Sequence, residues 1–328
     1  MEDFIAPNDP LDRARVRVLS VRSDARGFAH LAKHIAILAA TGTLVWLTSG
    51  VWWLMPPAMV VHGIVVAFVF TGHHEMIHRT AFKSRRLNDG ISFITGFLVF
   101  YPATYFRLFH FAHHRYTQDP ERDPELAAPP PRSAGAYVWW AIGFPYWYRR
   151  FGTSFIHAFT GRAKQPFGRE SEVAECVAEA RWMWAGYIAI ITASLALQSW
   201  AAVIYWVGHI LLGQPFLRLY LMAEHTGCAN GPDMIANTRT TLTNPITRLI
   251  AWNMPYHTEH HVYPSVPFHA LPALHEELKP YLQVVGPGYF AVHRGLFRRL
   301  ESGKTGETAS WSGRPGSAPE RARRVGEP

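Results

Sequence analysis

The sequence predicts an all-α integral membrane protein in which four transmembrane helices support a cytoplasmic helical cap with a histidine-rich metal site. Two observations lead to this prediction: long apolar runs without charged residues, and three clusters of histidine at helical spacing. Length alone is less informative, because 328 residues can form one large domain or two small ones. The apolar runs and the histidine clusters therefore decide the fold class.

Four uncharged apolar runs are candidates for membrane spans. The first, residues 36–54, contains neither a charged residue nor a histidine, and as a helix it would be about 28 Å long, close to the thickness of a bilayer's hydrocarbon core. The others cover residues 56–72, 182–200 and 200–217. Buried helices of a soluble protein usually show a polar stripe, which these runs lack. We therefore expect four spans.

The distribution of basic residues predicts the orientation of these spans. The expected turns at Met55–Pro56 and Gln198–Ser199 contain no Lys or Arg. The N-terminal arm, residues 1–29, and the start of the next segment are instead basic, with Arg13, Arg15, Arg17, Arg22, Arg26 and Lys33. The segment after the second span adds Arg79, Lys83, Arg85 and Arg86. By the positive-inside rule, we expect an integral protein of a bacterial inner membrane with both termini in the cytoplasm.

The net charge of +8 has the same explanation. It indicates attraction to the membrane surface and to an electron-donor protein. The sequence contains no recognisable nucleic-acid motif, so we do not expect nucleic acid as a partner. The first ten residues, MEDFIAPNDP, are acidic and polar, which is not the pattern of a cleavable signal peptide.

Two further apolar segments are interrupted and are not counted as spans. Residues 90–106 separate the first two histidine clusters, and a full crossing there would place these clusters on opposite faces of the membrane. We therefore predict a re-entrant or interfacial segment, which Gly90, Gly96 and Pro102 make easier. Residues 137–151 are rich in Trp and Tyr and end with Arg149 and Arg150, which predicts a segment along the membrane surface.

Three histidine clusters carry the chemistry. They are His74 and His78 in HEMIH, His110, His113 and His114 in HFAHH, and His257, His260 and His261 in HTEHH. Residues three or four apart lie on one face of a helix, so the imidazoles of each cluster can converge. A single pair could be structural, but three clusters with a repeated H-x-x-H-H spacing indicate a metal site. Eight donors exceed the four that one zinc ion uses, which indicates two metals.

Acidic residues near the clusters are candidates for orienting the metal ligands. A carboxylate that accepts the second ring N–H of a ligating histidine fixes its tautomer and raises its basicity. We predict this role for Asp119 and Asp123, and include Glu259 as a further candidate. For Glu75, Glu224 and Glu259, an orienting role and a solvated surface charge both remain open.

The setting favours an oxygen-activating metal. Imidazole binds iron, copper and zinc, so ligand type does not choose among them. A hydrolytic zinc site does not need four membrane spans, whereas a site that oxidises a lipid chain needs to lie at the membrane. Cleavage of an unactivated C–H bond also requires chemistry that side-chain acids and bases do not supply.

These motifs resemble those of the membrane fatty acid desaturase superfamily, which includes desaturases, hydroxylases and carotenoid ketolases. The resemblance covers residues 30–285 and depends on HEMIHRTAFKSRRLNDG, FRLFHFAHHRYTQDPERDPEL and WNMPYHTEHHVYPSVPFH. It implies two non-haem irons, O2 as oxidant and two electrons from a separate donor of the ferredoxin, rubredoxin or cytochrome type. It also implies that the eight clustered histidines are ligands, and that His225, in AEHTG, is a ninth.

Three functions remain open from the sequence. The first is desaturation of a fatty acyl chain or lipid, and the second is hydroxylation or ketolation of a lipid, carotenoid or small aliphatic metabolite. The third is a non-catalytic protein with structural metal, which the excess of ligands disfavours. AEHTG resembles the E-H-Y-G element of membrane alkane hydroxylases, which keeps the second function open.

His73 is a rival ligand to His74, but it lies five residues from His78 and so on a different helix face.

The remaining chain provides no second metal-binding module. Cys176 and Cys228 form no C-x-x-C pair, which excludes a cysteine-ligated iron–sulfur or rubredoxin-like module in this chain. We expect His62 and His209, inside predicted spans, to form hydrogen bonds between helices. No metal role is assigned to His30, His34, His157, His269, His275 or His293. Residues 286–328 form a C-terminal segment that we expect to end in a disordered tail.

Overall fold

The computed structural model describes residues 10–127, 131–163 and 170–301. The helical elements are, in chain order, α1 (Arg13–Leu19), α2 (Asp24–Thr48), α3 (Met55–Ala67), α4 (Val69–Ile77), α5 (Arg85–Leu98), α6 (Ala103–Tyr116), the 3-10 turn η1 (Pro124–Ala127), α7 (Ala134–Ile142), α8 (Phe144–Thr160), α9 (Glu170–Ala196), the π-helical turn η2 (Val203–Val207), α10 (Gly208–His225), α11 (Met234–Asn237), α12 (Pro245–Ile250), α13 (His257–Val262), α14 (Leu271–Leu278) and α15 (Tyr289–Glu301).

The helical fold class is confirmed, with one small exception. Two two-residue strands, β1 (Thr240–Thr241) and β2 (Val285–Gly286), pair in parallel with Thr240 opposite Val285. This pairing connects the segment before the third histidine cluster to the segment before α15. The predicted tail, residues 302–328, lies outside the described residues.

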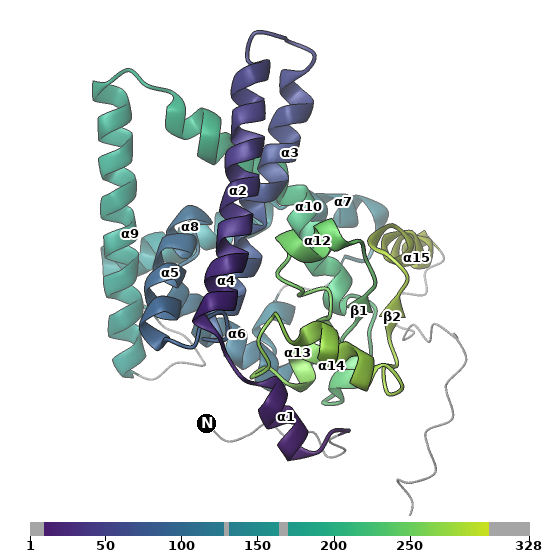
Figure 1. The fold of residues 1–328 in the computed structure, drawn as a ribbon. Helices are drawn as coiled ribbons and strands as arrows, with labels where there is room; N and C mark the ends of the chain where they lie inside the picture. The colour runs from purple at the N-terminus through teal and green to yellow at the C-terminus, as the bar shows by residue number, and fades with distance from the viewer. Residues whose placement is uncertain (1–9, 128–130, 164–169, 302–328) are drawn as a thin grey trace, which may run out of the picture.

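Helices α2 and α3 form a long hairpin that rises above the rest of the molecule (Figure 1). Asp24–Thr48 and the continuous segment Met55–Ile77 are both long and apolar enough to cross a membrane. The first begins earlier than the predicted residue 36, because Ser23 caps it by accepting a hydrogen bond from the Arg26 N–H at 3.3 Å. The histidine-bearing helices α6 and α13 lie at the end of the molecule opposite the hairpin turn (Figure 1).

The third and fourth predicted spans differ from the expectation. The described residues contain two helical segments that are long and apolar enough to cross a membrane. The number rises to three if α5 and α6 are counted together as one bent span. The predicted third span, residues 182–200, overlaps the second half of α9. The first half of this helix carries the charged residues Glu175, Glu179 and Arg181. The predicted fourth span contains η2 and Pro215, both of which interrupt regular α-helical hydrogen bonding.

Residues 90–106, predicted as a re-entrant or interfacial segment, belong to two helices: Gly90 and Gly96 lie inside α5, and Pro102 directly precedes α6. The axes of α5 and α6 differ by 98°, and Phe100 in the connection has a positive φ of 56°. The new helix α6 is capped from a distant element, because the Glu179 carboxylate accepts hydrogen bonds from the backbone N–H groups of Ala103 at 2.8 Å and Thr104 at 2.7 Å. This cap fixes the start of the helix that carries the second histidine cluster.

The segment 137–151 also divides into two helices. Gly143, with φ of 79°, ends α7 and precedes α8, and Pro145 occupies the first turn of α8 without breaking it. A proline in the first turn leaves no intrahelical donor unsatisfied, whereas the left-handed conformation favours glycine. The sharp bend therefore belongs to Gly143.

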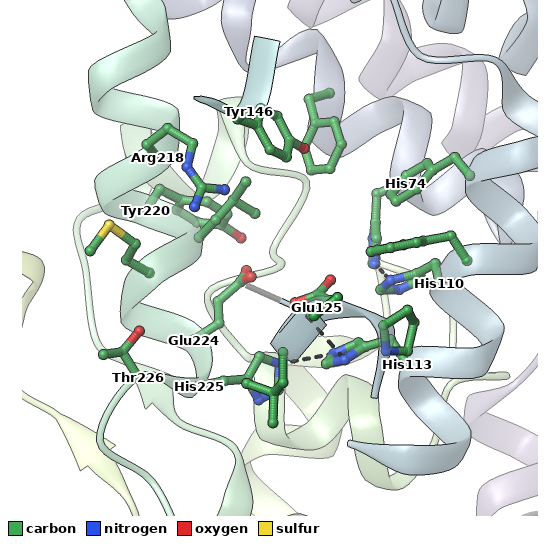
Figure 2. Close-up of a pocket in the computed structure, with 18 of the residues that line it drawn as sticks. His74, His110, His113, Glu125, Tyr146, Arg218, Tyr220, Glu224, His225 and Thr226 are labelled. Atoms are coloured by element: carbon green, nitrogen blue, oxygen red, sulfur yellow. Dashed lines mark hydrogen bonds and ion pairs between the residues drawn. The ribbon is translucent and has the colours of Figure 1, made fainter. Parts of the chain in front are cut away.

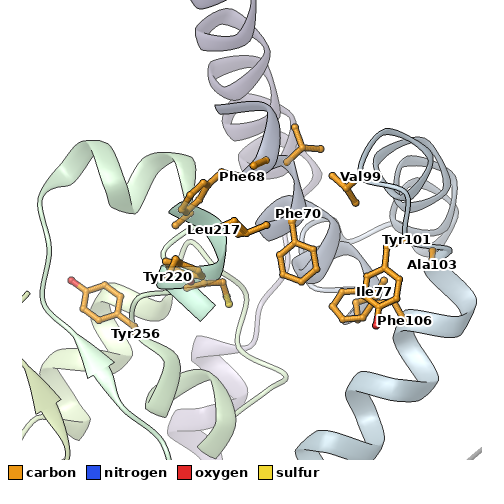
Figure 3. Packing of buried hydrophobic residues seen from close by; sticks show 14 of the residues in the cluster. Phe68, Phe70, Ile77, Val99, Tyr101, Ala103, Phe106, Leu217, Tyr220 and Tyr256 are labelled. Atoms are coloured by element: carbon orange, nitrogen blue, oxygen red, sulfur yellow. The ribbon is translucent and has the colours of Figure 1, made fainter. Parts of the chain in front are cut away.

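The core lies between the long helices and the histidine-bearing elements. Figure 3 shows Phe68 and Phe70 beside Leu217 and Tyr220, with Tyr101 and Phe106 on the other side. Above this core, α3 and α10 approach so closely that a Cβ on Gly213 would overlap the Gly63 carbonyl. Close backbone contact of this kind is typical of helices that pack inside membranes.

Candidate metal centre

Four helices supply the predicted metal ligands. His74 lies on α4, with His78 at its C-cap, and α6 carries the second histidine cluster. His225 ends α10, and α13 carries the three histidines of HTEHH. All of these imidazoles are buried except that of His78, which is partly exposed. A packed interior therefore surrounds many polar nitrogen atoms.

The first group contains five histidines whose ligand atoms all lie within 4.8 Å of one another: His74, His78, His110, His114 and His260. At its centre, His110 Nε2 lies 2.7 Å from His74 Nε2 and 2.9 Å from His114 Nε2. We call this spatial group the first cluster. From here on, 'cluster' means such a group in space and no longer one of the three histidine-rich stretches of the sequence.

The second group contains His113, His225 and His261, within the same limit of 4.8 Å. His257 joins it, because His257 Nε2 lies 3.1 Å from both His225 Nε2 and His261 Nε2. His113 Nε2 lies 3.3 Å from His225 Nε2. We call these four residues the second cluster. All nine predicted ligands thus belong to one cluster or the other.

The two H-x-x-H-H motifs divide their imidazoles in opposite ways. On α6, His110 and His114 enter the first cluster and His113 enters the second. On α13, His257 and His261 enter the second cluster and His260 enters the first. In each motif the first and last histidines are four residues apart and share a helix face, whereas the middle histidine points to one side of that face. Each motif therefore contributes to both clusters.

The donor set fits two metal ions. His260 is fully buried, and neither of its ring nitrogens has a hydrogen-bond partner. The Nδ1 atoms of His74, His110 and His114 are also buried without a partner. Unpaired buried polar atoms are costly, and imidazoles whose ring nitrogens converge at 2.7 to 3.3 Å have the arrangement that a shared cation would stabilise.

Asp123, one of the predicted orienting residues, contacts a histidine of the second cluster. His113 Nδ1 lies 2.9 Å and 3.1 Å from the two carboxylate oxygens. The backbone N–H groups of Gln118 and Glu125 donate to the same carboxylate at 2.8 Å and 2.9 Å. Burial disfavours the charged carboxylate, but the hydrogen bond from His113 and those from the backbone hold the pKa of Asp123 below its ordinary range. Asp123 is therefore an ionised acceptor at neutral pH.

Glu224 also faces a histidine of the second cluster. Its Oε1 lies 3.4 Å from His257 Nδ1. Of the two roles that the sequence left open for this residue, its position favours the orientation of a metal ligand.

The structure differs from the prediction at Asp119 and Glu259. Asp119 binds the Arg122 side chain and the backbone of the following turn, at the protein surface. Glu259 is fully buried and accepts hydrogen bonds from Thr240 Oγ1 and His275 Nδ1, both at 2.5 Å. It therefore joins α13 to β1 and α14.

Glu75 has a structural contact as well. Its Oε1 accepts the backbone N–H of Phe268 at 2.9 Å, which connects α4 to the segment after α13. Among the carboxylates that the sequence proposed, those that reach the clusters are Asp123 and Glu224.

Histidines outside the nine lie apart from the clusters. His73 Nδ1 lies 3.1 Å from Thr95 Oγ1, and its ring stacks on Phe106. His62 pairs with Thr41 Oγ1 at 2.8 Å and packs edge-to-face on His209. The interhelical role expected of His62 is thus observed.

A cavity of about 770 Å³ opens beside the clusters. Figure 2 shows His74, His110, His113 and His225 on one side and Arg218 and Tyr146 on another. Aromatic residues form much of its wall: Phe70, Tyr101, Tyr105, Phe106, Phe109, Trp140, Tyr146 and Tyr220. The cavity gives an organic molecule access to the metal-binding nitrogens.

Two lining residues were missed by the sequence analysis. Arg150 was placed at the end of a segment along the membrane surface, yet it is buried on α8 and lines the cavity. Arg218, on α10, was not singled out, although an ionisable residue directly after an apolar run is a signal of function. Only the three-dimensional packing distinguishes Arg150 from its exposed neighbour Arg149.

Comparison with known proteins agrees with the architecture of the site. A family model described as fatty acid desaturase matches residues 11–293. Dihydrorhizobitoxine desaturase from Bradyrhizobium elkanii is 29% identical over 303 residues, which cover 85% of this chain and 82% of that protein. An sn-1 oleoyl-lipid 12-desaturase from Picosynechococcus sp. is 22% identical over 206 residues, or 58% of this chain and 56% of that protein. With its histidine clusters, the chain belongs to the fatty acid desaturase family of oxidoreductases.

Proposed function

We propose that this protein is an O2-dependent di-iron desaturase that converts a saturated carbon–carbon bond of an aliphatic substrate into an alkene. The observation that carries the proposal is the pair of histidine clusters at one wall of a largely aromatic cavity. The first cluster would hold one iron with five imidazoles and the second would hold the other with four. The balanced reaction consumes the substrate's two hydrogens, O2, two electrons and two protons, and it releases the alkene and two waters.

The bound irons would supply the oxidising power that amino-acid side chains lack. The protein positions the ligands and the substrate. Asp123 holds the His113 ring with its Nε2 towards the second cluster, and Glu224 faces His257 Nδ1 in the same way. The aromatic wall excludes water from the alkyl part of the substrate and places its C–H bonds beside the histidines.

The four-span topology is part of the proposal. Helix α9 carries large apolar side chains that face outward, including Trp182, Ile188, Ile191 and Leu195, and α10 packs along α3. These features favour lipid contact for α9 and a membrane-embedded position for α10. The re-entrant α5–α6 pair then keeps the clusters on the cytoplasmic side together with both termini.

An external protein would supply the electrons. A second cavity, of about 550 Å³, is lined by His114 and His261 and also by Arg115 and Arg122. One buried imidazole of each cluster thus lies beside a surface cavity whose lining also contains Asp119 and Glu121. A donor of the ferredoxin, rubredoxin or cytochrome type would dock at this opening, because it is adjacent to imidazoles of both clusters.

Hydroxylation is the alternative outcome of the same centre, and a single experiment separates the two. Cells that express the full chain and cells that express the His110→Ala variant are compared by mass spectrometry of lipids and polar metabolites. Desaturation predicts a product two hydrogens lighter than its substrate, whereas a product heavier by one oxygen indicates a hydroxylase. Identical metabolite profiles in the two cultures, together with an iron-free purified protein, would refute both functions.

A further inference from the structure

Two buried arginines share one aromatic ring beside the cavity. The guanidinium carbons of Arg150 and Arg218 lie 3.9 Å and 4.6 Å from the centre of the Tyr146 ring. Arg150 comes from α8 and Arg218 from α10, and they are only 5% and 8% exposed. Stacking on an aromatic face holds a guanidinium in place and leaves the edge of its plane, where the N–H groups point, available for hydrogen bonds.

Neither arginine forms a close ion pair in the described part of the chain. No carboxylate oxygen there forms an ion pair with either guanidinium within 4.0 Å. Arg150 donates to the Val99 carbonyl at 3.3 Å and to the Tyr146 hydroxyl. Its Nε, like the Nε of Arg218, is buried without a partner. Arg218 faces the carboxyl groups of Glu125 and Glu224 in the same cavity, but neither of them forms an ion pair with Arg150. An anion from outside the chain would therefore supply the partner that the buried Arg150 guanidinium lacks and would also reach Arg218.

The anion site and the metal-binding histidines line the same cavity. Arg150 and Arg218 share its wall with His74, His113 and His225. Figure 2 shows Arg218 and Tyr146 across the cavity from His74 and His110. A molecule held by its charged end at the arginines would extend its alkyl part along the aromatic wall towards the clusters.

We propose that Arg150 and Arg218 bind the carboxylate of a small free acid, which is the substrate of this enzyme. This inference rests on the proposed function and names its substrate class. A carboxylate matches the planar N–H fork of a guanidinium, whereas the carbonyl of an ester-linked acyl chain carries no charge to balance two arginines. The cavity volume of about 770 Å³ lies in the range that encloses a small molecule. The distance from the carboxylate would then decide which C–H bond is oxidised.

The test measures binding and does not depend on turnover. Purified, iron-loaded full chain is titrated calorimetrically with hexanoate, its neutral analogue hexanamide and hexyl phosphate. We expect hexanoate to bind at least roughly tenfold more tightly than hexanamide, which is the effect of one charge-assisted contact of moderate strength. In Arg150→Gln and Arg218→Gln, this ratio should fall below about threefold without loss of iron. Arg162→Gln, an exposed arginine outside the cavity, is the matched control and should behave as the wild type.

A conservative variant covers the case in which a glutamine variant fails to fold. Arg218→Lys keeps the charge and loses the planar fork, so the ratio should be reduced and remain above one. Equal binding of hexanoate and hexanamide to the wild type would overturn the proposal. Tighter binding of hexyl phosphate than of hexanoate would also overturn it, and would assign the site to a phosphate headgroup. Carboxylate selectivity in a protein that holds no iron would support the anion site and refute the proposed function.

Discussion

Asp123 accepts a hydrogen bond from His113 Nδ1 at 2.9 Å, and this contact turns the opposite ring nitrogen, Nε2, to within 3.3 Å of His225. Asp123→Asn keeps the shape of the side chain and removes its charge. We expect metal affinity at the second cluster to fall by about 10- to 100-fold, as when other ligand-orienting carboxylates are lost. Iron per chain, measured after mild chelation, should decrease from two towards one.

Asp119→Asn is the matched control for this prediction. Asp119 lies in the same loop, but it binds Arg122 at the surface, so its loss should leave the iron content unchanged. Equal iron loss in both variants would indicate that the loop as a whole, and not the contact with His113, supports the centre.

His225 and His73 should differ as metal ligands. His225 lies in the second cluster, whereas His73 faces Thr95 and Phe106. We expect His225→Ala to abolish turnover and lower bound iron, and His73→Ala to keep most of its iron and measurable activity, with some loss of stability from the cavity left in the core. Full iron occupancy in both variants, with activity lost only in His73→Ala, would reverse the assignment.

Glu179 should stabilise the bend before α6. Its carboxylate accepts two backbone N–H groups at the start of that helix, from Ala103 and Thr104. Glu179→Ala removes both acceptors and should lower the free energy of unfolding by about 1–2 kcal/mol. Thermal unfolding followed by circular dichroism measures this change, and Glu175→Ala, an exposed glutamate one turn earlier, should change it by less than about 0.5 kcal/mol.

Gly213 should be essential for the packing of α10 on α3. A Cβ at this position would overlap the Gly63 carbonyl, and relief of that overlap requires the two helices to separate. We expect Gly213→Ala to cost about 1–3 kcal/mol and to lower the yield of folded protein in size-exclusion chromatography. Gly90→Ala places its Cβ where no atom lies within 4 Å, so it should be neutral or slightly stabilising.

The α5–α6 bend should never reach the outer face of the membrane. Ile94 on α5 is 57% exposed, and Trp52 in the α2–α3 turn is 85% exposed. With Cys176 and Cys228 replaced by serine, a membrane-impermeant maleimide should label Trp52→Cys in intact cells and should leave Ile94→Cys unlabelled. Labelling of Ile94→Cys from outside would show that α5 crosses the membrane.

The sequence predicted the centre better than the scaffold around it. Histidine spacing is local, so HFAHH and HTEHH could be placed on helices without knowledge of the fold. The orienting carboxylates were harder to identify. Asp119 and Asp123 lie in one loop with similar sequence surroundings, and the turn that folds Asp123 onto His113 depends on backbone contacts from Gln118 and Glu125.

Long-range contacts explain the other differences. The bend between α5 and α6 was expected from glycine and proline, but its cap comes from Glu179, about 75 residues away in the chain. Arg150 and Arg149 are adjacent and chemically identical, and only the packing of α8 buries the first and exposes the second. Hydropathy could not place α9, because its charged first half lies in the same helix as its apolar second half.

The opposite division of the two H-x-x-H-H motifs has a consequence for the order in which the centre assembles. Four of the five imidazoles of the first cluster lie before residue 115, whereas three of the four in the second, His225, His257 and His261, lie after residue 224. A ribosome therefore completes most of the first cluster while the second still consists of His113 alone. Most donors of the first cluster are therefore available early in synthesis, whereas the second cluster must wait until α13 has reached its place beside α6.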